Sequence, residues 1–373
     1  MRHHALSITA AAVILAALVA YIGYVVSRPG SVANPFTDGA APSHTPRPSA
    51  SATPKPPPAP FPARGKVFLG VQTATGPFDF TPVDDFATAT GYRPPVLQFT
   101  QGWAGDTFHT DNFNKIAERG MMPIVAWEPW DYNTTGAARH NGDQPTYRLA
   151  RITAGDFDDY VHTWAEGIKS LGYPVGIRFA HEMNGFWYPW CESANGNRPG
   201  DYVKAFRHVH DIFTEVGATN VVWIWSPNVT YSGAKPLENL YPGNKYVDWV
   251  GLSGYYGTEG RTGYQSFNTI FTRTFTELRR FTKRPIVITE TGATNANGQQ
   301  ARWITQTFQQ LPQHANVIGV IWFEVDKELD WRIVENPDSV KAFAKGSSAG
   351  RYAVTWNENT VPRTTLSASA GSS

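Results

Sequence analysis

The chain contains 373 residues, with 32 lysines and arginines, 31 aspartates and glutamates, and a formal net charge of +1. This near balance offers neither a basic surface for nucleic acid nor a strong field for an acidic partner. The single cysteine, Cys191, excludes an internal disulfide and a cluster of thiolate metal ligands; we expect a packed thiol there, with an exposed thiol as the alternative.

The first segment of the chain is apolar and stands apart from the expected globular unit. Residues 5–26 are almost wholly apolar, and about 20 such residues are enough for a helix to cross about 30 Å of hydrocarbon. The sequence therefore predicts a transmembrane anchor or signal segment at 1–28, and the poor fit to a cleavage site favours the anchor. In both cases we expect the rest of the chain to be secreted or on the extracellular face of the cell membrane.

Two compositionally biased segments flank the expected domain. Residues 29–63 are rich in proline, serine and alanine, a composition that favours extended conformations and cannot bury a core. Residues 346–373 show no clear apolar period and are expected to form a loosely ordered, low-complexity tail. The remaining segment, 64–345, has about the length of an eightfold barrel and is predicted to be one domain.

Eight short apolar runs alternate with helical patterns along this domain. Several runs are nearly continuous in valine, isoleucine, leucine and aromatic residues, as expected of strands that are buried on both faces. Alternating strands and helices predict a parallel sheet, and eight units predict closure into an α/β fold, the (β/α)8 TIM barrel. The strands are expected at 67–72, 95–99, 123–127, 176–181, 221–225, 248–253, 285–289 and 318–323, and the clearest helices at 156–172, 201–217, 266–281 and 299–311.

Two glutamates stand at the ends of predicted strands four and seven. Side chains at the carboxyl ends of barrel strands face a common mouth, so Glu182 and Glu290 are expected to face each other there. Hydrolysis of a glycosidic bond needs such a pair. We expect retention of configuration, with Glu182 as the protonated acid/base and Glu290 as the ionised nucleophile. Arg178, on the same predicted fourth strand, is the candidate cation beside Glu290, with a structural ion pair as the alternative.

Other chemistries fit the motifs less well. His181-Glu182 resembles the start of a zinc-binding H-E-x-x-H motif, but Gly185 stands where the second histidine is needed, so we expect no metal. The segment around Ser253 lacks the last glycine of a serine hydrolase motif, and no glycine-rich phosphate motif follows the first strand. We therefore expect no cofactor. Glu128, at the end of the third strand, is open to three roles: catalysis, substrate contact or loop anchoring.

The run Arg178-Phe-Ala-His-Glu-Met-Asn-Gly-Phe-Trp187 closely resembles the strand-four signature of glycoside hydrolase family 26, best known for endo-β-1,4-mannanases. Further segments that resemble the family occur in the same order, and together they cover most of 64–345. The resemblance implies that Glu182 is the acid/base and Glu290 the nucleophile. It also implies that His181 contacts the sugar or orients the carboxylates, that Trp187 flanks Glu182, that Tyr255 hydrogen-bonds Glu290 and that Trp322 lies under the sugar, with barrel packing as the alternative for each aromatic residue. Trp127, Asn184 and Arg178 are the further expected substrate-binding residues.

The resemblance leaves the substrate open. Family mannanases often carry an aspartate two residues before the strand-six tyrosine, where this chain has Ser253. β-1,4-Mannan is the first expectation, and β-1,3-1,4-glucan or β-1,3-xylan are the alternatives on the same scaffold. A surface protein that binds polysaccharide without cutting it is the alternative from another class, and the presence of both carboxylates argues against it. We expect a monomer whose only partners are the polysaccharide and, through the first helix, a membrane.

Overall fold

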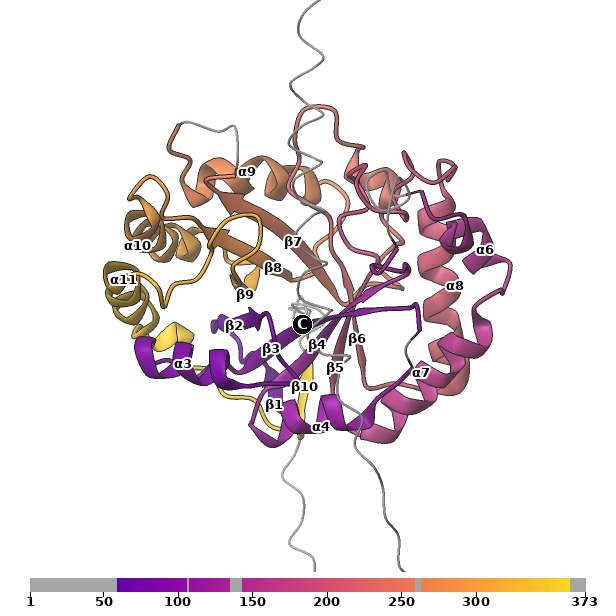
Figure 1. Ribbon diagram of the computed structural model, residues 1–373, viewed down its shortest axis with the longest axis horizontal. Helices are drawn as coiled ribbons and strands as arrows, with labels where there is room; N and C mark the ends of the chain where they lie inside the picture. Colours follow the sequence, from indigo (N-terminus) through magenta and orange to yellow (C-terminus); the bar gives the residue numbers. More distant parts are fainter. Residues whose placement is uncertain (1–58, 106, 135–142, 259–262, 363–373) are drawn as a thin grey trace, which may run out of the picture.

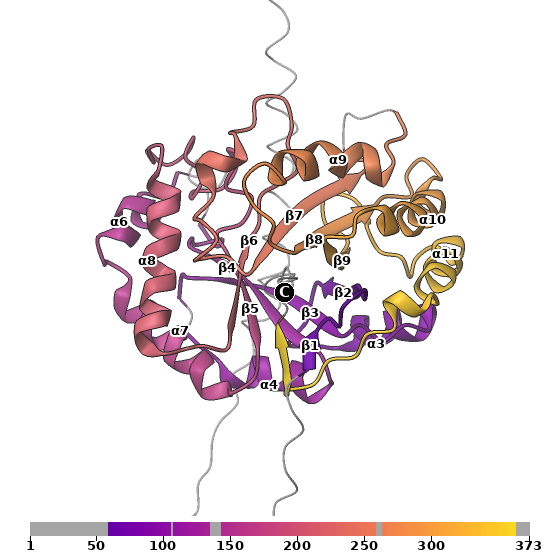
Figure 2. The ribbon, with the colours of Figure 1, turned by 180° about the vertical axis from the view of Figure 1, so that it is seen from behind.

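The computed structural model describes residues 59–105, 107–134, 143–258 and 263–362. Eight parallel strands close into a barrel in chain order, with helices around its outside (Figures 1 and 2). The predicted (β/α)8 TIM barrel is therefore confirmed, and every predicted strand overlaps one barrel strand. The barrel strands are β2 (Phe68–Thr73), β3 (Val96–Gly102), β4 (Met122–Glu128), β5 (Val175–Phe179), β6 (Val221–Trp225), β7 (Trp249–Tyr256), β8 (Ile286–Ala293) and β9 (Val317–Glu324).

The helices that cover the barrel include all four that were predicted. Helix α8 (Asp201–Val216) shows the sequence logic: it buries one apolar stripe and ends at Gly217, which adopts the left-handed conformation that glycine tolerates best. The other predicted helices are α7 (Asp158–Leu171), α9 (Phe267–Leu278) and α10 (Gln300–Gln310). The helices not predicted are shorter or weaker in period: α3 (Thr81–Thr90), α4 (Thr110–Glu118), α6 (Leu149–Thr153) and α11 (Pro337–Ser347), with 3-10 turns at Pro145–Tyr147, Leu237–Leu240, Leu311–Gln313 and Gly350–Tyr352.

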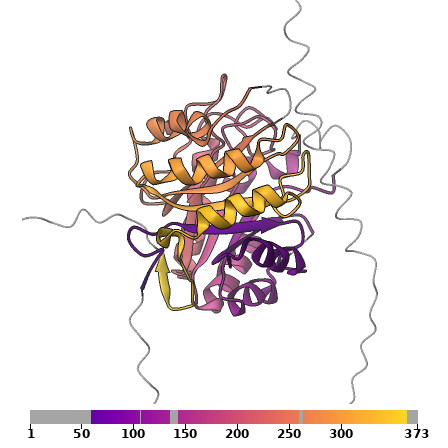
Figure 3. The ribbon, with the colours of Figure 1, turned by 90° about the vertical axis from the view of Figure 1, so that its left-hand side faces the viewer.

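The folded unit extends beyond both expected boundaries. Strands β1 (Ala59–Phe61) and β10 (Thr360–Pro362) pair in parallel outside the barrel (Figures 1 and 3). The ring of Phe61 stacks on Phe68, the first residue of β2, so this pair covers the amino-terminal end of the barrel. Residues 346–362, expected to be loosely ordered, belong to the fold because isolated aromatic residues, which create no period, are buried there: Tyr352 and Trp356.

The first 58 residues lie outside the described part of the chain. The predicted anchor or signal segment at 1–28 falls wholly there, as does nearly all of the proline-rich segment. Within the residues that the structure describes, no helix combines the length and apolar character needed to cross a bilayer.

Candidate active site

Glu182 and Glu290 line one open cleft of about 530 Å³ at the carboxyl end of the barrel. Glu182 follows β5 and Glu290 lies within β8, so the barrel brings together two residues from distant parts of the chain. The volume lies within the range of small-molecule and sugar sites. The expected meeting of the two carboxyl groups in one mouth is therefore what the structure has.

Glu290 is held by donors on both carboxylate oxygens. Arg178 donates from Nη1 to Oε2 at 2.6 Å, and the Tyr255 hydroxyl donates to Oε1. Burial alone would raise the pKa of Glu290, but the charge of Arg178, the Tyr255 hydroxyl and the charge of Lys327 hold that pKa below its usual value. Glu290 is thus an ionised carboxylate at neutral pH.

Arg178 is fully buried, and three of its nitrogens donate hydrogen bonds to side chains. Its Nε donates to Ser226 Oγ at 2.9 Å and its Nη2 donates to Ser253 Oγ at 2.6 Å. These bonds fix the plane of the guanidinium group, which in turn fixes Glu290. Arg178 is thus the expected cation beside Glu290, and the two residues form a largely buried ion pair. Ser253, at the position where many mannanases carry aspartate, is buried against Arg178 and is not a residue that lines the cleft.

Glu182 is also held through both oxygens, but its environment favours the protonated form. Trp187 Nε1 donates to Oε2 at 2.9 Å and Asn228 Nδ2 donates to Oε1 at 3.1 Å. Burial raises the pKa of Glu182, the negative charge of Glu290 raises it further, and Arg178 and the hydrogen bonds oppose them; the net pKa lies above the usual value. The two carboxyl groups are therefore shifted in opposite directions, which is the pattern of an acid and a nucleophile.

The backbone that carries Glu182 is not a simple continuation of the strand. Strand β5 ends at Phe179, and both Ala180 and Glu182 have positive φ, 46° and 55°, in the left-handed region that side chains avoid. A hydrogen bond from Glu182 N to Ser226 O at 2.7 Å and the packed, fully buried thiol of Cys191 against Glu182 O hold this turn. Such strain persists where the surroundings enforce it, often at functional sites.

Asn184 lies behind the cleft rather than in it. Its Nδ2 donates to Asn228 O at 2.9 Å and its Oδ1 accepts from Asn228 N at 2.9 Å, and the side chain is 1% exposed. The expected substrate contact from Asn184 is therefore wrong for the described structure. Both ends of its amide form hydrogen bonds with the backbone of Asn228 and so fix the segment after β6. Asn228, which contacts Glu182, was missed as a site residue, although its place three residues after the predicted strand is the signal that could have found it.

His181 and Glu128 form a buried pair beside the cleft. His181 Nδ1 lies 3.7 Å from Glu128 Oε1, and neither is a residue that lines the cleft. The His181 ring packs edge-on to Tyr188, and Glu128 Oε2 accepts from Trp130 Nε1 at 2.7 Å, which anchors the loop after β4. This geometry gives Glu128 the anchoring role, whereas the contact of His181 with the sugar or with the catalytic carboxylates stays a prediction. Burial lowers the pKa of His181 and raises that of Glu128 to about 8.

The raised pKa of Glu128 predicts a stability that falls as pH rises. Between its ordinary pKa of 4.5 and about 8, the folded protein keeps a proton that the unfolded chain releases. The free energy of unfolding should then fall by up to about 1.4 kcal/mol per pH unit over this range and level off above it. Glu128→Gln, which retains an acceptor for Trp130, should flatten this slope. Urea unfolding from about pH 5 to pH 9 measures it, and equal slopes for both proteins would contradict the prediction.

Trp127 does not reach the cleft. It is fully buried outside the strand wall, where its ring packs on Trp103 and Trp164 at centroid distances of 4.9 and 4.8 Å and its Nε1 donates to Tyr160. The expected substrate contact is therefore wrong. Because side chains alternate along a strand, the neighbouring Glu128 faces the site side and Trp127 faces the helices.

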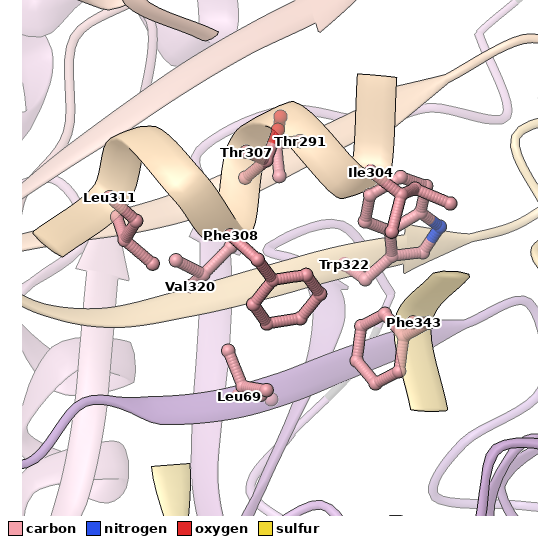
Figure 4. Close-up of a pocket in the computed structure, with 10 residues that line it drawn as sticks. Leu69, Thr291, Ile304, Thr307, Phe308, Leu311, Val320, Trp322 and Phe343 are labelled. Atoms are coloured by element: carbon pink, nitrogen blue, oxygen red, sulfur yellow. The ribbon is translucent and has the colours of Figure 1, made fainter. Parts of the chain in front are cut away.

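Trp322 is likewise displaced from its expected place under the sugar. It lines a small apolar cavity of about 20 Å³ between β9 and the outer helices, together with Ile304 and Phe343 (Figure 4). Its Nε1 donates to Trp331 O at 2.9 Å. The aromatic side chains that do line the cleft at this point are Phe323, the next residue of β9, and Trp331, so the expectation was one strand position out.

The loop after β9 forms the remaining wall of the cleft and was not predicted as part of the site. Glu324, at the end of β9, accepts hydrogen bonds from Ile333 N and Val334 N at 2.9 and 3.1 Å, which folds the loop back on the strand. The returned loop places Lys327 and Glu328, 3.2 Å apart, in the cleft. In the described part of the chain, no group of three or more histidine, cysteine, aspartate or glutamate residues is arranged to hold a metal ion.

The chain is similar in sequence to a family of glycosidases and to several of its relatives. A family model described as glycosyl hydrolase family 26 matches residues 130–321, more than half of the chain. Endoglucanase H of Acetivibrio thermocellus is 32% identical over 290 residues, which cover 76% of this chain but only 30% of that protein. A mannan endo-1,4-β-mannosidase of Bacillus subtilis is 27% identical over 267 residues, covering 63% of this chain and 69% of the relative.

A solved structure agrees in fold. A family 26 β-mannanase from Bacteroides ovatus superposes with a TM-score of 0.58 at 20% identity, over 78% of this chain and 91% of that one. At this identity the likeness concerns the fold, and the family model carries the assignment. The chain belongs to glycosyl hydrolase family 26.

Proposed function

We propose that this chain is a retaining, endo-acting glycoside hydrolase that cleaves a β-linked polysaccharide by double displacement. The observation that carries the proposal is the pair of carboxyl groups, Glu182 and Glu290, that line one cleft and have pKa values shifted in opposite directions. A protein that only binds polysaccharide has no use for such a pair. Membership of family 26 supports the same function.

In the first step, Glu290 attacks C1 of the sugar while Glu182 gives its proton to the glycosidic oxygen. The bond from C1 to that oxygen breaks, the leaving sugar chain departs with a hydroxyl group, and a covalent glycosyl-enzyme forms on Glu290. Arg178 and Tyr255 keep Glu290 ionised and oriented before the attack.

In the second step, Glu182 acts as a base. Now a carboxylate, it takes a proton from a water molecule as the water oxygen attacks C1 and the bond to Glu290 breaks. Asn228 and Trp187 donate hydrogen bonds to Glu182 and stabilise its charge between the two steps. Two inversions at C1 leave the product in its original β configuration.

β-1,4-Mannan is the proposed substrate. The mannan endo-1,4-β-mannosidase of Bacillus subtilis is similar over 63% of this chain, and its name describes cleavage of mannan inside the polymer. The open cleft, rather than an enclosed pocket, suits attack within a chain.

β-1,3-1,4-Glucan is the second candidate, because two observations favour it. The relative that is 32% identical over 290 residues is an endoglucanase, and Ser253 replaces the aspartate common in mannanases. Mannose and glucose differ only at C2, so one or two hydrogen bonds decide between them.

Product release by the purified protein tests the function and its substrate together. Mannan, mixed-linkage β-glucan and β-1,3-xylan should be compared, and the anomer released first should be identified by NMR. We expect shorter oligosaccharides from mannan with β configuration. Products of α configuration would contradict double displacement, and binding of all three polymers without cleavage would favour a binding protein.

Asn228 offers a test of the acid/base assignment. Its hydrogen bond favours the ionised form of Glu182, so Asn228→Ala should raise the pKa of Glu182 and move the alkaline limb of the kcat/KM profile upward by about 0.5–1 pH unit. Asn228→Asp, which brings a second carboxylate, should move the limb further in the same direction. A limb that stays in place in both variants would show that another group sets it.

We also propose that the enzyme works outside the cell, tethered by or released from its first segment. The apolar run at 5–26 supports this placement. Strand β1 begins at Ala59, at the end of the barrel opposite the cleft. A tether joined there leaves the cleft facing away from its point of attachment.

A further inference from the structure

Phe186 is an exposed apolar side chain at the edge of the cleft. Its side chain is 50% exposed, and it lines the cleft together with Glu182, Trp187 and Tyr231. Its ring lies 5.2 Å from that of Trp187 in an edge-on arrangement, and the Trp187 ring lies 6.0 Å from that of Tyr231. These three rings, Phe186, Trp187 and Tyr231, form a continuous aromatic shelf.

The loop that carries the shelf, around Gly185, is held in place by hydrogen bonds. Gly185 N donates to Glu182 O at 2.9 Å, and Ser193 Oγ donates to Gly185 O at 2.9 Å. A side chain at 185 would come within 2.7 Å of the Trp187 ring, so glycine lets that ring fold back over the loop. The Tyr231 hydroxyl donates to Asn184 O at 3.2 Å, which ties the second side of the shelf to the same loop. Phe186 is therefore presented to solvent by a fixed backbone.

The shelf lies on the acid/base side of the cleft. Its central residue, Trp187, donates a hydrogen bond to Glu182, whereas no residue of the shelf donates one of the hydrogen bonds described for Glu290, which come from Arg178 and Tyr255. In the proposed reaction Glu182 protonates the oxygen of the leaving group, so the departing sugar lies on the side of Glu182. The wall formed by β9 and the loop after it carries an ion pair, Lys327 with Glu328, beside the rings of Phe323 and Trp331. The two sides thus differ in that only the β9 side carries an ion pair among the described residues that line the cleft, whereas the shelf offers aromatic rings beside Glu182.

We propose that Phe186, with Tyr231, binds the sugars of the leaving-group half of the substrate, beyond the unit that contacts Trp187. The occupant is a β-linked hexopyranose chain, whose axial C–H groups form apolar faces that stack on aromatic rings. This inference rests on the proposed function, because it takes its direction from the role of Glu182. It makes Phe186 a determinant of chain-length preference.

Two substrates of different length separate this role from a general loss of activity. Phe186→Ala should lower kcat/KM on an oligosaccharide that fills the leaving-group half by about 3- to 10-fold. It should leave kcat/KM unchanged on an aryl β-glycoside, whose leaving group carries no sugar. Phe186→Tyr, which keeps a ring, should behave as the wild type. Phe78→Ala is the matched control, since Phe78 is 62% exposed and does not line the cleft.

Binding gives a second measurement that does not depend on turnover. In a Glu290→Gln background, titration calorimetry with the same oligosaccharide should show an affinity weaker by about 3- to 10-fold when Phe186 is changed to alanine. Equal affinity and equal kcat/KM for Phe186→Ala and its parent would overturn the inference while leaving the proposed function intact. An equal loss on the aryl glycoside would also overturn it, because it would show a disturbed catalytic centre.

Discussion

Glu290→Ala is expected to lower kcat on the preferred polysaccharide by about 10⁴-fold or more, because the variant lacks the carboxylate that is proposed to attack C1. Arg178 and Tyr255 would remain directed at the vacant position. Removing the carboxylate leaves the buried Arg178 without its ionic partner, so some loss of stability is also expected. Initial rates and a thermal unfolding midpoint should be measured together. Glu290→Gln is the control, because it keeps an acceptor for Arg178.

The space left by Glu290→Ala gives this prediction its stereochemical test. Azide added with an aryl β-glycoside that has a good leaving group should enter that space and attack C1 from the face that Glu290 used. The aryl group leaves as its phenolate, and the product is the α-glycosyl azide, with one inversion. Recovery of the β-azide, or retention of most of the activity by the variant, would show that another residue is the nucleophile.

The sequence predicted site residues correctly where a charged residue stands at or near the end of an apolar strand. Glu182, Glu290 and Arg178 are charged residues within or just after apolar runs, so the pattern of the chain alone is enough to predict their burial at a barrel mouth. The contacts from Arg178 and Tyr255 to Glu290 agree with that expectation. A charged side chain in a strand that is buried on both faces is expected at the mouth of the barrel, because charged groups are rarely buried in an apolar core.

The sequence was misleading for aromatic residues in the same strands. Trp127 and Trp322 lie in runs that are apolar on both faces, so hydrophobicity does not show which side chains point inward and which point toward the helices. A bulky ring packs equally well against a helix. Both residues lie outside the cleft for this reason, while Phe323 lies within its lining.

The residues that were missed depend on contacts between distant segments. Asn228 reaches Glu182 only because Asn184 holds the chain after β6. Lys327 and Trp331 reach the cleft because Glu324 accepts two backbone hydrogen bonds from the far end of their loop. Such loops have no repeating pattern of apolar residues in the sequence, and their conformation is set by hydrogen bonds that form only in the folded chain.

Glu182→Ala is expected to separate the two chemical steps. On polysaccharide, where the leaving oxygen is basic, kcat should fall by about 10²–10⁴-fold because no proton is delivered. On an aryl β-glycoside with an acidic phenol, the leaving group needs no proton, so the glycosyl-enzyme should still form quickly on Glu290. Its hydrolysis should then be slow, because no base remains to activate water.

The kinetics of this variant should therefore show a burst of phenolate equal to the enzyme concentration, followed by slow turnover. Azide needs no base, so it should speed the second phase and release the β-glycosyl azide, with configuration retained. The alkaline limb of the pH profile, set in the wild type by the raised pKa of Glu182, should disappear. An equal loss of activity on the polysaccharide and on the aryl glycoside would contradict the role of Glu182 as the acid, because it would show that the effect does not depend on the leaving group. Opposite azide products from the two alanine variants would fix the two roles, since each carboxylate vacates a different face of the same carbon.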